Sequence, residues 1–357
     1  MPEIKIGSYK IGPLHPPFIV AEIGANHNQS LEYALRLVDA AKAAGAQAIK
    51  LQTYTADTMT LNIREGGFTI NDERSLWYGK TLYELYQEAH TPWQWHKEIF
   101  QRAEKQGLIA FSTPFDATSV DFLESLNIPC YKIASLEIVD LQLIQKVAST
   151  GKPIILSTGA STLEEIEDAV NAARKAGCKQ LILLKCTSTY PAPPHEINLR
   201  TLPNLASRFH SCVGISDHTQ GIGTALASIA FGSCLIEKHF TLSRKDDGLD
   251  AAFSLEPAEL SVLVHESYQA WQALGSIHYG PSPSEETSLA LRRSLYFVKE
   301  MQAGETITAE HIRAIRPAGG LSPKEYSHIL GLKVNSTVKI GDPVSRNVIH
   351  CYKRKLT

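Results

Sequence analysis

Eight short apolar segments recur along the first three quarters of this chain, and each is followed by a stretch of helical periodicity. The segments are rich in aliphatic residues and end in polar ones; they are Phe18–Glu22, Ala48–Gln52, Leu108–Ser112, Cys130–Ser135, Pro153–Thr158, Leu181–Cys186, Val213–His218 and Leu235–Phe240. Near-continuous apolar strands that alternate with helices predict a parallel sheet covered by helices. Eight such units in about 250 residues favour an α/β fold, the (β/α)8 TIM barrel.

Helical patterns such as Leu31–Ala44, Trp93–Gln106 and Thr162–Ala176 lie between these segments. Ser161 with Glu164 predicts a capping box at the start of the last of them. A doubly wound sheet is the alternative fold, but no Gly-x-Gly-x-x-Gly motif follows the first apolar segment. The barrel is therefore the preferred prediction.

Two parts of the chain depart from the repeating pattern. Tyr54–His90 is too long for an ordinary strand-to-helix connection, which predicts a lid, a binding loop or a subunit contact. Tyr279–Thr287 is rich in Pro, Ser and charged residues, which is typical of a linker. Short strand-like runs and frequent glycines follow it. We therefore expect a barrel domain over residues 1–277, a linker over 278–290 and a small β-rich domain over 291–357.

Charge and cysteine content argue against several classes of protein. The 357 residues include 35 Lys and Arg against 37 Asp and Glu, so no basic excess is available for binding nucleic acid. No segment approaches the roughly 20 apolar residues that span a bilayer. Residues 1–10 lack the apolar core of a signal peptide. The cysteines are widely spaced and form no Cys-x-x-Cys pair; they are Cys130, Cys178, Cys186, Cys212, Cys234 and Cys351. We expect reduced thiols in a cytoplasmic protein that has neither a nucleic-acid nor a membrane partner.

Polar residues gather where the predicted strands end, which is where the active sites of such barrels form. The set consists of Glu22, Lys50, Gln52, Ser112, Thr113, Lys132, Ser135, Ser157, Thr158, Lys185, Thr187, Ser216, Asp217, His218, Glu237, Lys238 and His239. Lysines among apolar strands are costly unless an anion or a carboxylate neutralises them. The set therefore predicts a phosphate-bearing substrate. The alternative is that individual lysines pair with Glu22, Glu137 or Glu237.

His218 and His239 end neighbouring strands of the predicted barrel, so both imidazoles can face the same point. Two neutral imidazoles suit Mn²⁺, Fe²⁺ or Zn²⁺. Glu22, on the first strand, lies beside the eighth in a closed barrel. A metal site and a pair of hydrogen-bonded histidines both remain open at this point.

At these strand ends the sequence resembles the sialic acid synthase family. The matching segments are AEIGANHN (Ala21–Asn28), KLQTY (Lys50–Tyr54), FSTPFD (Phe111–Asp116), YKIAS (Tyr131–Ser135), STGAS (Ser157–Ser161), CTSTYP (Cys186–Pro191), GISDHT (Gly214–Thr219) and EKHFTL (Glu237–Leu242). After the linker, Arg293–Phe297, Ala303–Thr308 and Ile315–Leu321 resemble the family's C-terminal SAF (antifreeze-like) domain. The resemblance implies condensation of phosphoenolpyruvate with an open-chain amino sugar, giving a nine-carbon 2-keto acid and phosphate.

Two segments resemble the branch of the family whose product is pseudaminic acid. They are GLDAAFSLEP (Gly248–Pro257) and the long connection over Ser75–Trp93. This branch implies 2,4-diacetamido-2,4,6-trideoxy-L-altrose as the sugar, with Trp77, Tyr78 and Tyr83 as its aromatic contacts. N-acetylneuraminate or legionaminate synthesis by the same chemistry is the alternative, and a metal-dependent aldolase on the same barrel is a more distant one.

The resemblance also implies roles for individual residues. The metal ligands are His218 and His239, with Mn²⁺ as the expected ion and Mg²⁺ or Co²⁺ as alternatives. The residues at phosphoenolpyruvate-binding positions are Lys50, Thr113, Lys132, Ser135, Ser157, Ser216 and Ser188, the last standing where many family members have asparagine. Gln52, Tyr190 and Asp250 match sugar-contacting positions. Arg316 matches an arginine that reaches an N-acetyl group in the other subunit's barrel, which implies a domain-swapped homodimer.

A mechanistic hypothesis assigns the three catalytic carboxylates. Glu22 orients the sugar aldehyde or a water on the metal. Glu137 or Glu237 takes the proton from the water that attacks the phosphoenolpyruvate carbon. Either of these two can instead be the structural partner of a lysine.

Overall fold

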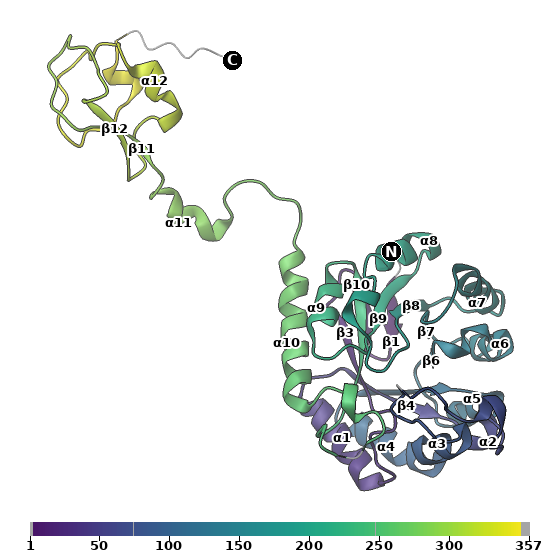
Figure 1. Ribbon diagram of the computed structural model, residues 1–357. Helices are drawn as coiled ribbons and strands as arrows, with labels where there is room; N and C mark the ends of the chain where they lie inside the picture. The colour runs from purple at the N-terminus through teal and green to yellow at the C-terminus, as the bar shows by residue number, and fades with distance from the viewer. Residues whose placement is uncertain (1–2, 74, 247, 351–357) are drawn as a thin grey trace. The chain divides into compact units, whose positions relative to one another are not determined.

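The computed structural model describes residues 3–73, 75–246 and 248–350 (Figure 1). Its contacts divide the chain into two compact units, and the boundary along the chain lies between Gly275 and Ser276. No described helix combines the length and the apolar character needed to cross a membrane.

The first unit is a closed barrel of eight parallel strands, which confirms the predicted fold class. Its strands are β3 (Phe18–Glu22), β4 (Ala48–Thr53), β5 (Ile109–Pro114), β6 (Tyr131–Ile133), β7 (Ile154–Ser157), β8 (Leu181–Cys186), β9 (Cys212–Ser216) and β10 (Ser233–His239). The strands follow each other around the barrel in chain order, and β10 closes it against β3. Each predicted apolar segment contains or overlaps one of these strands.

Helices surround the barrel, as Figure 1 shows. They are α1 (Leu31–Ala43), α4 (Trp93–Lys105), α5 (Ala117–Ser125), α6 (Leu141–Ser149), α7 (Leu163–Lys175), α8 (Thr201–Phe209), α9 (Gly223–Ile229) and α10 (Pro257–Leu274). Short 3₁₀ helices interrupt the connections; they are η2 (Leu136–Val139), η3 (Pro194–Glu196) and η4 (Ala251–Phe253). The capping box of α7 is formed by Thr162 and Glu165, so the predicted pair Ser161 and Glu164 is wrong by one residue. Both pairs fit the same sequence rule, and only the pair next to the first helical residue can reach the free amides.

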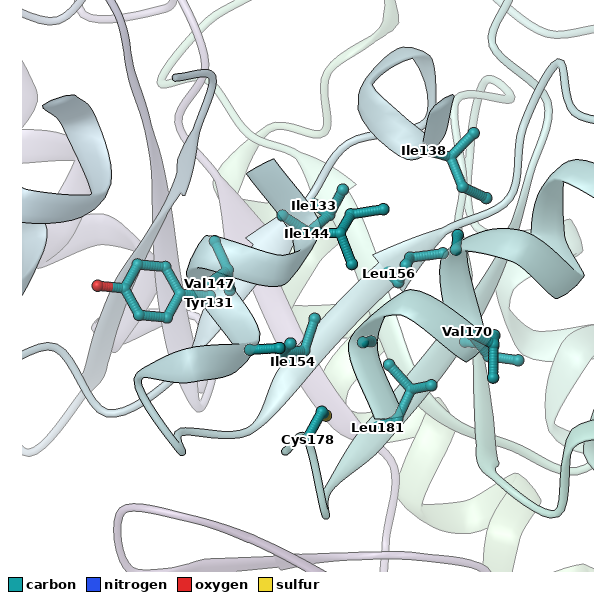
Figure 2. Close-up of a cluster of buried hydrophobic side chains, with 14 of the residues drawn as sticks. Tyr131, Ile133, Ile138, Ile144, Val147, Ile154, Leu156, Val170, Cys178 and Leu181 are labelled. Atoms are coloured by element: carbon teal, nitrogen blue, oxygen red, sulfur yellow. The ribbon is translucent and has the colours of Figure 1, made fainter. Parts of the chain in front are cut away.

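Two apolar layers hold the barrel together. The outer layer fills the space between strands and helices; Figure 2 shows the part around β6, β7 and β8, where Tyr131, Ile154 and Leu181 pack with Ile144 and Val170 of the helices. The inner layer fills the barrel itself. The hairpin of β1 (Ile4–Ile6) and β2 (Tyr9–Ile11) adds its isoleucines to that inner layer, so the hairpin packs against the barrel interior. Together these layers fix the strand ends on which the polar residues stand.

The long connection between β4 and α4 contains α2 (Ala56–Met59), η1 (Gly66–Phe68) and α3 (Leu82–Ala89). Helix α3 starts at a capping box in which Thr81 and Glu84 satisfy each other's backbone amides. Local capping thus orders a segment whose sequence shows no strand or long helix.

The second unit is small and has its own core. Its elements are η5 (Pro283–Glu285), α11 (Glu286–Leu289), β11 (Ser294–Phe297), β12 (Ile312–Ile315), η6 (Pro323–Glu325), α12 (Tyr326–Ile329) and η7 (Arg346–Val348). Strands β11 and β12 pair antiparallel. Buried Leu295, Phe297, Ile312, Val334 and Val344 belong to one apolar cluster.

The cysteines that the structure describes are Cys130, Cys178, Cys186, Cys212 and Cys234, and all five are buried thiols that take part in no disulfide. Cys351 lies outside the described residues. The described cysteines therefore form no disulfide frame.

Candidate active site

A cavity of about 240 Å³ lies at the C-terminal ends of the barrel strands. Fourteen of the residues predicted for the site line it: Lys50, Gln52, Thr113, Lys132, Ser135, Glu137, Ser157, Ser188, Tyr190, Ser216, His218, Glu237, His239 and Asp250. Glu22 is fully buried behind Lys50 and does not line the cavity. Arg316 follows β12 in the second unit and is exposed.

Two lysines and two carboxylates form a buried charge network at the base of the cavity. Lys50 forms a salt bridge with Glu22, and its Nζ lies 3.6 Å from Oε1 of Glu237. The Nζ of Lys132 lies 3.9 Å from the same Glu237 oxygen. Thr113 accepts a hydrogen bond from Lys50 at 3.2 Å. The protein's own carboxylates therefore already neutralise these lysines in part.

The pKa shifts follow from this arrangement. Burial by itself lowers the pKa of Lys50, but the carboxylates of Glu22 and Glu237 outweigh burial and raise it. Burial lowers the pKa of Lys132, and the more distant Glu237 offsets this only in part. Burial raises the pKa of Glu237, but Lys132 and Lys50 prevail and lower it. Glu237 is thus held as a carboxylate, which makes it a poor proton acceptor.

Glu137 has a different environment although it lines the same cavity. Burial raises its pKa, and no described lysine or arginine lies within salt-bridge distance of its carboxylate. A carboxylate with a raised pKa and no lysine or arginine partner within salt-bridge distance among the described residues is suited to take a proton from water. Lys185, another predicted strand-end lysine, is half-buried, donates to the carbonyl of Cys186 and does not line the cavity.

A group of small hydroxyl side chains surrounds Gly159, beside the lysines. The amide of Gly159 donates to Oγ of Ser135 at 3.1 Å. A Cβ on Gly159 would lie 2.4 Å from Oγ of Ser188 and 2.7 Å from Oγ of Ser135. Oγ of Ser157 is buried without a hydrogen-bond partner. Lysines together with hydroxyl donors make this part of the cavity suitable for a small polyanion.

His218 lies two residues beyond β9 and His239 ends the neighbouring strand β10, and their ring centroids are 5.4 Å apart. Nδ1 of His218 lies 3.1 Å from the carbonyl of Thr187, and donation to that carbonyl leaves Nε2 with a lone pair. Nδ1 of His239 is buried without a hydrogen bond, 3.5 Å from Oδ2 of Asp250. Burial raises the pKa of Asp250, but the nearby His239 outweighs it and lowers that pKa.

These histidines fit a divalent cation only as an incomplete ligand set. No group of three His, Cys, Asp or Glu residues among the described residues is arranged to hold a metal. Two imidazoles, one with its tautomer fixed and one with an unsatisfied buried nitrogen, supply two ligands of the kind that such cations prefer. The other coordination positions would be filled by water or substrate oxygens.

Aromatic side chains form one wall of the cavity. The ring of Tyr190 lies 4.6 Å from His218 and 6.1 Å from Trp77, centroid to centroid. Tyr54 packs edge-on against Tyr86 and Phe115. Trp77, Leu85 and Tyr86 come from the long connection after β4, so that connection contributes directly to the cavity.

The predicted aromatic contacts are in part wrong. Trp77 lines the cavity, but Tyr78 is 55% exposed and Tyr83 donates its hydroxyl to Asp57 at the surface. The sequence provided no means to separate the three, because their orientation depends on how the connection folds back.

Sequence reasoning missed several cavity residues; they are Tyr54, Phe115, Tyr86, Cys186 and Leu249. The sequence predicts only a reduced thiol for Cys186, whereas its Sγ lies 3.7 Å from both Oγ of Ser188 and Nδ1 of His218. Burial raises the pKa of this thiol, but His218 outweighs burial and brings it to about 7. Its position as the last residue of β8 was the available signal.

Both parts of the chain are similar to known protein families. The NeuB family model matches residues 37–279, and the SAF domain model matches residues 292–347. Pseudaminic acid synthase of Helicobacter pylori is 43% identical over 94% of this chain and 98% of its own length. N,N'-diacetyllegionaminic acid synthase of Campylobacter jejuni is 38% identical over 88% of this chain and 94% of its own. The crystal structure of N-acetylneuraminic acid synthetase from Leptospira borgpetersenii, in complex with citrate, is 34% identical with a TM-score of 0.72, covering 81% of this chain and 95% of that one.

Proposed function

The chain belongs to the NeuB family, and on that premise we propose that it condenses phosphoenolpyruvate with 2,4-diacetamido-2,4,6-trideoxy-L-altrose and water. The products are pseudaminic acid and phosphate, so the enzyme is a carbon–carbon bond-forming transferase. The observation that carries the proposal is the single cavity that brings together buried lysines, hydroxyl groups, two histidines and an aromatic wall. Each of these parts corresponds to one requirement of the reaction.

Phosphoenolpyruvate occupies the part of the cavity around the lysines. Lys50, Lys132 and Thr113 face its negative charges, and the hydroxyl donors are Ser135, Ser157, Ser188 and Ser216. At an effective dielectric constant near 20, each lysine about 4 Å from a unit negative charge contributes on the order of 4 kcal/mol. Glu22 and Glu237 favour the charged form of Lys50 before the substrate arrives, and Glu237 favours that of Lys132.

The sugar lies along the aromatic wall. Tyr190 and Trp77 offer apolar surface to a 6-deoxy sugar, while Gln52 and Asp250 accept or donate hydrogen bonds at its polar groups. The aldehyde end lies beside His218, which the Tyr190 ring contacts.

Synthases of this family are generally metal-dependent. In this chain His218 and His239 would hold the ion, for which we propose Mn²⁺, with Mg²⁺ or Co²⁺ as alternatives. When bound, such an ion polarises the sugar aldehyde oxygen as a Lewis acid. Glu22 does not line the cavity, but its Oε1 accepts hydrogen bonds from Gln52 at 3.1 Å and Gly24 at 3.0 Å. Its role in orienting the aldehyde would therefore act through Gln52, which lines the cavity.

The bond changes balance with a single water. C3 of phosphoenolpyruvate forms the new bond to the aldehyde carbon, which leaves positive charge at C2. Water adds to C2 and gives one proton to Glu137, and the former aldehyde oxygen takes up one proton to become a hydroxyl. The second water proton leaves C2–OH as the ketone forms and the C2–O bond to phosphate breaks, and it departs with the phosphate. We assign Glu137 rather than Glu237 as the base, because burial raises the pKa of Glu137 whereas two lysines lower that of Glu237.

The test is a substrate panel with added Mn²⁺, in which phosphate release from phosphoenolpyruvate is measured with each candidate sugar. We expect one phosphate per product and the highest kcat/KM with the diacetamido altrose. A preference for the neuraminate or legionaminate precursor would establish that alternative instead. Carbon–carbon bond formation without phosphate release would favour an aldolase on the same barrel.

Labelled water tests which bond to the phosphate breaks. In ¹⁸O-water the label should enter the product keto acid and be absent from the released phosphate. Label in the phosphate would contradict cleavage of the C2–O bond.

The proposal extends to the assembly and its location. We place the catalytic domain at residues 1–277, the linker at 278–290 and the SAF domain at 291–357. Arg316 of the SAF domain would reach an N-acetyl group of a sugar bound in the barrel of a second copy, which makes the active form a domain-swapped homodimer. A cytoplasmic location suits an enzyme that consumes phosphoenolpyruvate.

A further inference from the structure

An ion pair is buried directly behind the two histidines, on the side of the barrel that faces the helices. The Nζ of Lys238 lies 3.1 Å from Oδ2 of Asp217, and both side chains are fully buried. Asp217 immediately precedes His218, and Lys238 immediately precedes His239. Lys238 and His239 are successive residues of β10, so their side chains point to opposite faces. His218 and His239 line the cavity whereas Asp217 and Lys238 do not, so the ion pair and the histidines lie on opposite sides of these strand ends.

Lys238 also binds the connection that carries His218. Its Nζ donates to the carbonyls of Thr219 at 2.5 Å and Gly221 at 2.9 Å. Oδ1 of Asp217 accepts a hydrogen bond from the amide of Thr219 at 2.9 Å. Both residues that flank His218 are therefore tied to Lys238, the neighbour of His239. One ammonium group thus links the backbone of the two histidines.

Net stability does not account for this pair. Ile215 of β9, Ile236 of β10 and Phe240, which follows β10, belong to the apolar layer against the helices. In such a layer the cost of desolvating two charges offsets much of their attraction, and replacement by apolar groups is often neutral. The contacts of the pair converge on residues 217–221, the segment that carries His218. This arrangement indicates that the pair holds the backbone around His218 in position.

We infer that Asp217 and Lys238 are positioning residues that fix the separation and orientation of His218 and His239 for a divalent cation. This inference rests on the proposed metal site, and it assigns a role to two residues that touch neither the cavity nor a substrate. Groups that orient metal ligands from behind typically affect metal affinity 10- to 100-fold. Without the ammonium group, the Asp217–Gly221 connection loses three of its hydrogen-bonded anchors.

The experiment measures Mn²⁺ binding to the full-length protein without substrates, using the electron paramagnetic resonance signal of free Mn²⁺. Lys238→Met keeps the aliphatic stem and should raise the Kd for Mn²⁺ 10- to 100-fold. It also leaves Asp217 buried and unpaired, so lower stability is expected. The double variant Asp217→Asn, Lys238→Met removes that charge. It should recover much of the melting temperature lost by the single variant while its Kd stays raised.

A matched control removes an ion pair elsewhere. Lys152→Met breaks the pair with Glu124, 2.6 Å apart and outside the cavity, and should leave the Kd for Mn²⁺ unchanged. The visible absorption of the Co²⁺-loaded double variant gives a second readout, because it reports ligand geometry at saturating metal. It should differ from the spectrum of the unaltered protein.

The outcomes separate this inference from the metal site itself. A folded double variant with the Kd and the Co²⁺ spectrum of the unaltered protein would overturn the positioning role. An unaltered protein that binds no Mn²⁺, or a His218→Ala variant that binds it equally well, would overturn the metal site. Raised Kd values in both Lys238 variants, together with an unaffected Lys152→Met control, would support the positioning role.

Discussion

Gly159 stands where two serine hydroxyls approach the backbone, and the smallest possible change tests their part in anion binding. A methyl group there would lie 2.4 Å from Oγ of Ser188 and 2.7 Å from Oγ of Ser135. The two nearest contacts are rotatable hydroxyl ends, and the third, Cβ of Cys186, lies 3.2 Å away and needs a shift of only a few tenths of an ångström. Gly159→Ala should therefore fold but displace the hydroxyls. We expect the KM for phosphoenolpyruvate to rise about 10-fold, because the variant loses roughly one charge-assisted hydrogen bond to the substrate.

The measurement is steady-state kinetics with each substrate varied in turn, and the KM for the sugar should change little. Gly223→Ala is the control, because no atom lies within 4 Å of its added Cβ. An unchanged KM for phosphoenolpyruvate in Gly159→Ala would place the anion elsewhere in the cavity.

Glu137 is the residue on which the proposed proton transfer depends. Glu137→Gln removes the base while keeping the shape, and kcat should fall 10²- to 10⁴-fold. Since burial raises the pKa of Glu137, activity in the unaltered enzyme should decline as pH falls through a value above that of an ordinary glutamate. That acidic limb should be missing from the pH profile of the variant. A Gln variant that keeps both the rate and the limb would leave Glu237 as the base.

At the level of elements, a buried histidine connects α4 to two barrel strands. Nε2 of His96 lies 2.8 Å from Oγ1 of Thr53, which in turn lies 2.6 Å from Oγ of Ser112. Burial lowers the pKa of His96 from 6.5 to about 4. The unfolded chain therefore binds more protons than the folded one between these values, so stability falls as pH drops through this range.

This shift predicts a specific pH dependence of stability. When the pH is lowered from 7 to 5, protonation of His96 in the unfolded chain should lower the free energy of unfolding by about 2 kcal/mol. His96→Gln should show a correspondingly smaller loss in urea denaturation over that range, while His265→Gln, at an exposed position, should behave like the unaltered protein. Equal losses in all three would mean that His96 does not titrate on unfolding.

The elements also show how far the sequence could be interpreted. The strands were predictable because apolar segments must be buried, and the strand ends were predictable because a parallel barrel brings them to one rim. The aromatic wall of the cavity was not predictable from the sequence. Tyr54, Tyr86 and Phe115 come into contact only when a non-periodic connection folds back over the rim. The hydrogen-bond partners of Lys238 could not be predicted either, because Thr219 and Gly221 contribute backbone carbonyls, which no sequence pattern indicates.

For the whole molecule, the proposed exchange of SAF domains can be tested by mixing two inactive variants. His218→Ala damages the barrel, and Arg316→Ala damages the SAF domain. Alone, each homodimer should lose at least 10-fold in kcat/KM, about 1.4 kcal/mol of transition-state stabilisation. In a swapped heterodimer, the intact barrel of the Arg316→Ala chain meets the intact arginine of the His218→Ala chain, so one of two sites is complete.

Co-expression of the two chains with different affinity tags, followed by tandem purification, isolates the heterodimer. Its activity should approach half that of the unaltered dimer, since one site in two is restored. If Arg316 instead served its own barrel, neither chain would hold a complete site and the heterodimer would stay as inactive as its parents. A doubly altered chain paired with the unaltered chain provides the calibration, because a swapped arrangement leaves no complete site in that dimer while an unswapped one leaves one.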